Sequence, residues 1–403
     1  MFVQMCKLFV GVFLLYNTWY SQVWGPNQTI LYLSVGMSAV FMLLDAVFVM
    51  KRLNIGKINP IVKMYVIFGV YVVLTGIFVA VDKGGFLSSV FTYISFVLVA
   101  FEVWYISFRT NSCKWVLDCL YVLALICATT TIFYGQDYTT EVVVTTMSEF
   151  NNPNTLGVLM YVGIFTVVLQ KEALEKYFIL RYLSVFSFLY VILLTGSRKA
   201  FFAGIGLFLL WIVGYLGEKK NGKLTRKSAF IIIMIFTSIV IALNYMLNIY
   251  TGTAGFERLL LLFKEGGTSA RVSLMKDAVQ YWKQSPIFGI GLDQFKVLNP
   301  NEDYSHSTYA EVLSCTGIIG CLIFFIPLLK LLIVSIKKVL RKRENSYKMR
   351  ICLLMLGVEL FIGIGQIFIY SVIHMIVLLF IAELVYGSTD FDEKLASQRL
   401  EVN

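Results

Sequence analysis

Charged and polar residues interrupt this otherwise apolar chain at a few positions where they could do chemistry. The run TGSRKAFF, residues 195–202, places Arg198 and Lys199 inside a long apolar stretch, where buried charge is costly. Gly196 and Ser197 precede them and can open a helix whose free N–H groups bind an anion. The planar fork of an arginine beside such a helix end suits a phosphate or a pyrophosphate. Contact with lipid headgroups is the structural alternative for Arg198.

A second cation and a candidate base follow further along the chain. Arg271 opens the amphipathic run SARVSLMKDAVQYW, and its structural alternative is a charge on a helix surface. His306 stands in EDYSHSTYAEVL, at the entrance of an apolar run. Histidine, with an unperturbed pKa of about 6.5, can accept and return a proton near neutral pH, which suits a general base for a sugar hydroxyl. Tyr304 and Tyr309 are predicted to contact substrate, Tyr309 from the same helical face as His306.

Other polar groups have weaker assignments. NNPNTLG, residues 151–157, is either a capped helix start or a sugar contact through Asn154. Glu302 and Asp303 could shift the pKa of His306 or bind substrate. His374 is predicted to have a structural role. Because the two histidines are distant in sequence and no acidic cluster accompanies them, neither a metal site nor a cofactor is predicted. Acidic residues in apolar runs are weak candidates for proton or ion pathways, namely Asp45, Glu102, Asp118, Glu311, Glu359 and Glu383.

The elements that must position these residues are membrane helices. Of 403 residues, 58% are hydrophobic and 14% charged, and apolar runs of about 20 residues recur along the chain. This predicts an all-α polytopic membrane protein with about twelve transmembrane helices. The expected spans are 2–20, 29–50, 60–81, 86–107, 115–134, 153–169, 178–194, 199–217, 228–250, 308–334, 351–369 and 372–387.

Charge distribution predicts the topology. Basic loops such as 217–227 and 337–350 place both termini in the cytoplasm, with the first helix retained rather than cleaved. The net charge of +10 is therefore explained by anionic lipid, and no nucleic-acid partner is expected. The seven cysteines contain no C-x-x-C pair and are expected to be free thiols.

This topology divides the chain into three parts. Residues 1–250 hold helices one to nine, residues 251–307 form a large extracytoplasmic loop, and residues 308–403 hold the last three helices and a cytoplasmic tail. The amphipathic run is expected to be a helix lying in the membrane interface. Pro286, Gly289 and Gly291 after it predict a tight turn.

Three stretches in this order resemble the bacterial O-antigen ligase and polymerase superfamily, which includes the Wzy polymerases and the WaaL ligases. They are NNPNTLG, LLTGSRKAFF, and the block SARVSLMKDAVQYWKQSPIFGIGLDQF with SHSTYAEVLSCTGIIG, within residues 150–335. Ser307 stands where Asn commonly follows the histidine, and Lys199 replaces a small residue. The positions that match are Asn154, Ser197, Arg198, Arg271, Trp282, Pro286, Gly289, Gly291, Phe295, His306 and Tyr309.

The resemblance implies a fold similar to the C-type glycosyltransferases (GT-C) in the bacterial inner membrane, with an extracytoplasmic, metal-independent active site. The implied substrate is an undecaprenyl-diphosphate-linked oligosaccharide, and the implied partners are chain-length regulator and flippase proteins. His306 would be the base. The substrate-binding residues would be Arg198, Arg271, Lys199, Tyr309, Asn154, Tyr304 and Ser197.

Three functions compete. A polymerase of O-antigen, capsule or exopolysaccharide is favoured for two reasons. The surface that the outer loop offers is modest in size, and outer segments rich in Phe and Tyr suit a unique sugar repeat. A ligase would transfer the glycan to a different acceptor. A flippase would need neither the large loop nor His306, and the internal repeats typical of transporters are not seen.

Overall fold

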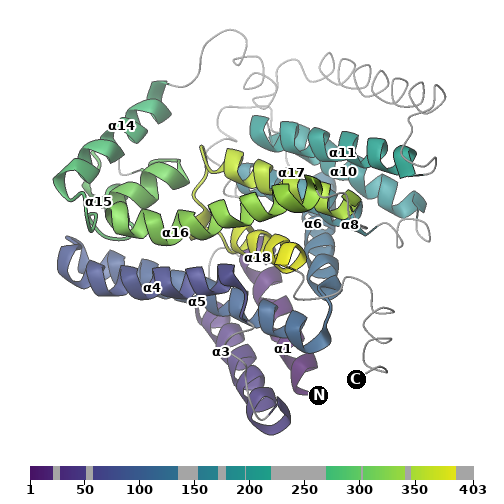
Figure 1. Ribbon diagram of the computed structural model, residues 1–403, viewed down its shortest axis with the longest axis horizontal. Coiled ribbons are helices and arrows are strands. Elements are labelled where there is room, and N and C mark those ends of the chain that lie inside the picture. The colour runs from purple at the N-terminus through teal and green to yellow at the C-terminus, as the bar shows by residue number, and fades with distance from the viewer. Residues whose placement is uncertain are drawn as a thin grey trace. The chain divides into compact units, whose positions relative to one another are not determined.

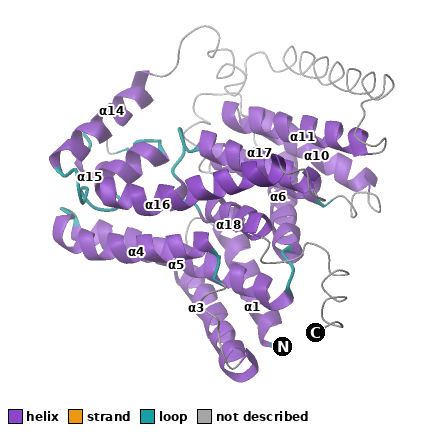
Figure 2. Ribbon diagram, viewed as in Figure 1, coloured by secondary structure: helices purple, strands orange, loops and turns teal. Residues whose placement is uncertain are grey.

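The computed structural model describes residues 1–20, 28–50, 58–134, 153–170, 178–195, 197–218, 269–300, 303–340 and 346–386. These residues form helices joined by short turns, and no strand occurs among them (Figures 1 and 2). The predicted all-α class is confirmed for this part of the chain. The bounds are α1 Phe2–Leu15, η1 Tyr16–Tyr20, α3 Gln28–Asp45, η2 Ala46–Met50, α4 Pro60–Val79, α5 Lys83–Thr110, α6 Lys114–Tyr134, α8 Pro153–Leu169, α10 Phe178–Thr195, α11 Arg198–Glu218, α14 Ser269–Gln284, α15 Gln294–Leu298, α16 Thr308–Leu340, α17 Ser346–Ile362, η4 Phe368–Tyr370 and α18 Val372–Tyr386.

Within the described ranges, 6 helices are long and apolar enough to cross a membrane. They are Phe2–Tyr20, Thr29–Val49, Pro60–Val79, Lys83–Thr110, Lys114–Phe133 and Thr308–Leu340. Shorter apolar helices are Asn154–Leu169, Ile179–Thr195, Lys199–Leu209 and Val372–Tyr386. The predicted span 228–250 lies outside the described residues, so the count of twelve spans and the GT-C-like arrangement stay predictions.

The chain divides into two compact units. The first contains residues 1–16, 27–116 and 268–403, and the second contains residues 17–26 and 117–267. In the first unit, α16 contacts α4, α14, α15, α17 and α18. In the second unit, α8 packs against α10 and α11. Each unit is described by itself.

Helix α16 is broken at Gly317. This residue has φ 64° and ψ −168°, a backbone region that is essentially restricted to glycine. The sequence predicted one continuous helix over 308–334, and this was wrong at Gly317. The run SCTGIIG, residues 314–320, is typical of a helix by composition, and the reason for the break lies elsewhere in the chain.

The loop that follows α14 supplies this reason, because its backbone hydrogen-bonds to the broken turn. The N–H of Gly291 donates to the carbonyl of Cys315 at 2.9 Å, and the N–H of Ile318 donates to the carbonyl of Pro286 at 2.9 Å. Gly289 lies so close that a Cβ there would be 2.4 Å from the carbonyl carbon of Cys315. The predicted turn of Pro286, Gly289 and Gly291 therefore exists, and its glycines allow two backbones to meet.

Helix α17 is shorter than the sequence predicted, since it ends at Ile362 rather than at residue 369. Residues 363–371 form an irregular segment with the turn η4. The carbonyls of Gly363 and Gln366 accept the N–H of Thr308 at 2.8 and 3.0 Å, and the Thr308 hydroxyl also donates to Gln366 O at 2.6 Å. These carbonyls thus bind the start of α16 instead of continuing their own helix.

The predicted amphipathic helix is α14. Its residues Leu274 and Ala278 are buried, and the Tyr281 hydroxyl donates to the Leu298 carbonyl at 2.6 Å. The apolar face therefore packs on the chain itself, and its location in a membrane interface stays a prediction. The other members of the buried cluster are Ile290, Phe295 and Cys315.

The segment between α14 and α16 is also fastened to the start of α5. Gln294 is buried; its Oε1 accepts the N–H of Asp82 at 2.7 Å and its Nε2 donates to the Asp82 carbonyl at 3.2 Å. Next to it, the Ser89 hydroxyl donates to Asp293 Oδ2 at 2.7 Å. The segment that leads toward His306 is therefore held from two sides, by α5 and by α16.

Candidate active site

His306 lies just before α16 and is not part of it. Its φ of 54° is left-handed, which costs an L-residue roughly 1–2 kcal/mol. The expectation that His306 and Tyr309 share a helical face was wrong, because the helix begins at Thr308. Strain of this kind persists only where the surroundings hold the residue in place.

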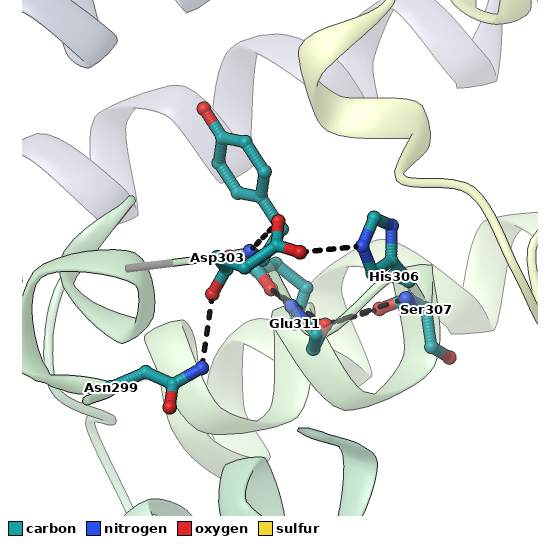
Figure 3. A network of polar contacts seen from close by, with 7 residues as sticks. Asn299, Asp303, His306, Ser307 and Glu311 are labelled. Carbon is teal, nitrogen blue, oxygen red and sulfur yellow. Dashed lines mark hydrogen bonds and ion pairs between the residues drawn. The ribbon is translucent and has the colours of Figure 1, made fainter. Parts of the chain in front are cut away.

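Asp303 orients the ring of His306. Nε2 of His306 lies 3.0 Å from Oδ2 of Asp303, and the two side chains are 36% and 46% exposed (Figure 3). When Nε2 carries the proton that this carboxylate accepts, the lone pair of the neutral ring is on Nδ1. Nδ1 is then the atom that can take a proton from a bound molecule.

The turn that carries Asp303 is itself hydrogen-bonded. Oδ1 of Asp303 accepts the N–H of Tyr304 at 2.7 Å, and Asn299 Nδ2 donates to the Asp303 carbonyl at 3.2 Å (Figure 3). Glu302, the other acidic neighbour predicted from the sequence, lies outside the described residues. Asp303 is thus the acidic group that the structure places against His306.

Ser307 begins α16. Its carbonyl accepts the N–H of Glu311 at 2.9 Å, and its hydroxyl lies 3.4 Å from the N–H of Ala310. Asparagine and serine are both favoured at a helix N-cap. Ser307, which stands where Asn is common in the resembling family, therefore occupies the N-cap position of α16.

Glu311 accepts hydrogen bonds from several parts of the first unit. Its side chain is fully buried. Oε2 accepts the N–H and the hydroxyl of Ser305 at 3.1 and 2.6 Å (Figure 3). Oε1 lies 3.4 Å from the Tyr370 hydroxyl and 3.6 Å from Cys315 Sγ. The sequence marked Glu311 only as a weak pathway candidate near a helix end, and it missed this role.

Tyr304 forms an aromatic contact beside the histidine turn. Its ring centroid lies 5.6 Å from that of Tyr370, and Lys296 Nζ lies 5.0 Å from the Tyr304 ring. Burial, together with nearby carboxylates, raises the pKa of Tyr304 to about 12. The phenol therefore stays protonated at neutral pH and can donate a hydrogen bond.

Asp293 is linked to this aromatic pair through its backbone. Its N–H donates to the Tyr370 hydroxyl at 3.0 Å. Burial raises the pKa of Asp293 above its usual range, against the lowering effects of the Ser89 hydrogen bond and of Lys296. The backbone of Asp293 and the carboxylate of Glu311 are thus linked through one tyrosine hydroxyl.

Tyr309 makes contacts within the chain. Its hydroxyl donates to the Leu360 carbonyl at 2.7 Å, and its ring stacks on Phe325 with centroids 5.3 Å apart. Its predicted contact with substrate stays a prediction.

His374 is buried, in keeping with the structural role that the sequence favours. Its Nδ1 lies 2.5 Å from Glu359 Oε2, and its Nε2 lies 3.3 Å from Gln366 Oε1. Gln366 in turn accepts Thr308 through its carbonyl. The pair therefore supports the segment on which the start of α16 rests.

In the second unit, the predicted helix start after Ser197 is confirmed. Ser197 is buried, and its carbonyl accepts the N–H of Phe201 at 3.0 Å. A Cβ at Gly157 of α8 would lie 3.1 Å from the Ser197 Cβ, so the first turns of α8 and α11 pack together. Asn154, one turn before Gly157, is half-buried and lies in the first turn of α8.

The predicted site residues thus fall into two sets. Arg271, Tyr304, His306 and Tyr309 belong to the first unit, with Arg271 in the first turn of α14. Asn154, Ser197, Arg198 and Lys199 belong to the second unit, with Arg198 as the first residue of α11. Across the described ranges, no three His, Cys, Asp or Glu side chains are grouped so that they could hold a metal ion.

Comparison with known proteins gives one family. Residues 183–325 match the family model described as O-antigen ligase. This stretch begins within α10, ends within α16 and includes Arg198, Arg271 and His306. A search of curated proteins finds no match.

Proposed function

We propose, from the match of residues 183–325 to the O-antigen ligase model, that this chain is a member of the O-antigen ligase and polymerase superfamily. Members of this family are membrane enzymes of the glycosyltransferase type. The proposed activity is transfer of a glycan from undecaprenyl diphosphate to the hydroxyl of a sugar, on the extracytoplasmic side of the bacterial inner membrane. The observation that carries the proposal is the partly exposed His306 ring, held by Asp303 at the entrance of α16.

In this proposal His306 is the general base. Nδ1 of the neutral ring takes the proton of the acceptor hydroxyl, while Asp303 stabilises the imidazolium that forms. The acceptor oxygen attacks the anomeric carbon of the donor, and the bond from that carbon to the diphosphate oxygen breaks. The electron pair leaves with the diphosphate, and the proton is later released to water.

The arginines are proposed to bind the diphosphate. Negative charge grows on this leaving group as its bond to the sugar breaks, and a guanidinium stabilises such charge strongly where water is excluded. Arg198 and Arg271 each lie in the first turn of a helix, whose free N–H groups also favour an anion. Lys199, Ser197 and Asn154 are proposed to assist in the same binding.

Polymerase and ligase differ in the acceptor. We favour a polymerase, which uses a second lipid-linked repeat unit as acceptor and works with chain-length regulator and flippase proteins. The second candidate is ligase-type transfer to a different acceptor, and the description of the matched family model favours it. Both candidates use the same donor and the same base.

The decisive experiment supplies the donor alone. The purified full chain in detergent is incubated with the lipid-diphosphate-linked repeat unit of its source bacterium, without added metal, and the product is run on a gel. We expect a ladder of increasing chain length. Transfer that appears only after lipid A core or another acceptor is added would indicate a ligase. No transfer to any acceptor would contradict the proposed activity and favour transport of the lipid-linked glycan.

A substitution at Arg198 tests the diphosphate contact. Arg198→Ala is expected to lower kcat/KM for the lipid-linked donor by about 10²-fold or more, because one charge-stabilising donor is lost. Arg198→Lys keeps the charge but not the bidentate fork, so it should lose about tenfold. The measurement is initial rate at limiting donor, with Lys283→Ala on the exposed face of α14 as the matched control. Full activity in both Arg198 variants would contradict the proposed contact of Arg198 with the diphosphate.

A further inference from the structure

We propose that Glu311 is a positioning residue that sets the place of His306, because one buried carboxyl group binds the histidine turn and Tyr370, and Tyr370 links it to a third segment. The inference rests on the proposed function only in that it treats His306 as the reacting base. Glu311 itself touches neither His306 nor, in the proposed reaction, the substrate. It acts through Ser305, the residue next to His306 in the chain.

The first segment is the histidine turn. Ser305 gives both its N–H and its hydroxyl to Glu311 Oε2, at 3.1 and 2.6 Å. Two hydrogen bonds to one neighbour fix the backbone immediately before His306. A residue at φ 54° needs such external support, because the left-handed conformation is unfavourable for histidine by itself.

The second segment contacts Glu311 Oε1, and the third is linked to it through the Tyr370 hydroxyl. The Tyr370 hydroxyl, from the irregular segment 363–371, lies 3.4 Å from this oxygen and accepts the N–H of Asp293 at 3.0 Å. A hydroxyl has one proton to donate, so Tyr370 donates to Glu311 while it accepts from Asp293. The loop before α15 is thereby linked to the loop before α16.

Donors face both oxygens of Glu311. Ser305, Tyr370 and the Cys315 thiol, 3.6 Å from Oε1, all have a proton to give. The two oxygens of a carboxyl group can serve all of these neighbours, whereas an amide offers one acceptor oxygen and an alkyl group offers none.

Replacement of Glu311 tests the inference by its effect on turnover. Glu311→Ala is expected to lower kcat by about 10- to 100-fold while KM changes by less than about threefold, because a displaced base slows the reaction without weakening donor binding. Glu311→Gln keeps one acceptor oxygen for Ser305, so its kcat should fall less than that of Glu311→Ala. Glu102→Gln, which alters an equally buried carboxylate on α5, is the matched control and should keep the parent kcat.

A second readout does not depend on glycosyl transfer. Diethyl pyrocarbonate acylates neutral imidazole, and the chain contains 2 histidines, His306 with its side chain 36% exposed and His374 with 3%. Mass spectrometry of the two peptides should show that Glu311→Ala changes the acylation rate of His306 by at least about threefold, because the turn opens locally. His374 should stay as unreactive as in the parent protein.

A double variant distinguishes an effect of Glu311 on the position of His306 from a general effect on the structure of the protein. In a His306→Asn background, Glu311→Gln should cause no further loss of kcat, because its effect acts through His306. The inference is overturned by an unchanged kcat and His306 acylation rate, by a full additional loss in the His306→Asn background, or by an acylated His374, which would mean general loosening. If the parent protein transfers no glycan, the proposed function fails, and acylation still tests whether Glu311 positions His306.

Discussion

His306→Asn is expected to lower kcat by about 10²- to 10⁴-fold, the range that a positioned general base contributes. Asparagine tolerates the left-handed backbone of this position, so the turn should keep its shape while the proton acceptor is lost. KM for the lipid-linked donor should change little, because the donor is bound by other groups. The measurement is the steady-state rate of transfer by the purified chain with saturating donor.

Two companion variants make this result specific. His306→Gln also lacks the base and should lose as much as His306→Asn. Asp303→Asn keeps the ring but removes the carboxylate that holds Nε2–H, so it should reduce kcat by less than loss of the ring does. A His306→Asn enzyme that retained more than about a tenth of the parent kcat would exclude a general-base role.

The largest loss of stability is expected from Gly317→Ala. A Cβ at this position would lie 2.3 Å from the carbonyl oxygen of Ile287, and the φ of 64° with ψ near −168° is unfavourable for alanine. We expect the free energy of unfolding to fall by about 3 kcal/mol or more. The fall should appear as a lower Tm of the purified chain in detergent.

Gly357→Ala is the matched control for this change. Gly357 lies within α17, where a Cβ would meet nothing within 4 Å. Alanine in a helix interior is favoured over glycine by about 1 kcal/mol, so this variant should have an unchanged or raised Tm. An unchanged Tm for Gly317→Ala would mean that the backbone contact between α16 and the preceding loop contributes little.

Apolar run length predicted most helices of the described residues well, because a bilayer demands a continuous apolar stretch with its backbone groups satisfied internally. The spans 60–81 and 178–194 correspond to α4 and α10 within two residues at each end. The errors lie where the backbone N–H and carbonyl groups of one segment form hydrogen bonds with those of a segment distant in sequence. Gly317 and the end of α17 are set by contacts with residues 286–291 and with Thr308, and local composition has no signal for such distant pairing.

The site shows the same division. His306 was proposed from its chemistry, and its contact with Asp303 was predicted from their nearness in sequence. The left-handed turn and the role of Glu311 were missed, because both depend on where Ser305 and Tyr370 lie in space. A usable signal was present in the serines 305 and 307 just before a helix whose first turn holds an acid.

The hydrogen bonds between residues 286–291 and the break in α16 also define an exchange unit for engineering. Besides the pair at Gly291 and Cys315, Ile290 N–H donates to the Ser314 carbonyl at 3.0 Å, so residues 286–291 and the first half of α16 are one backbone assembly. A chimera joined at residue 307 would combine residues 286–291 of one protein with α16 of another, although these two segments share backbone hydrogen bonds. A graft of residues 286–291 between relatives should therefore keep its fold only when it continues past residue 319.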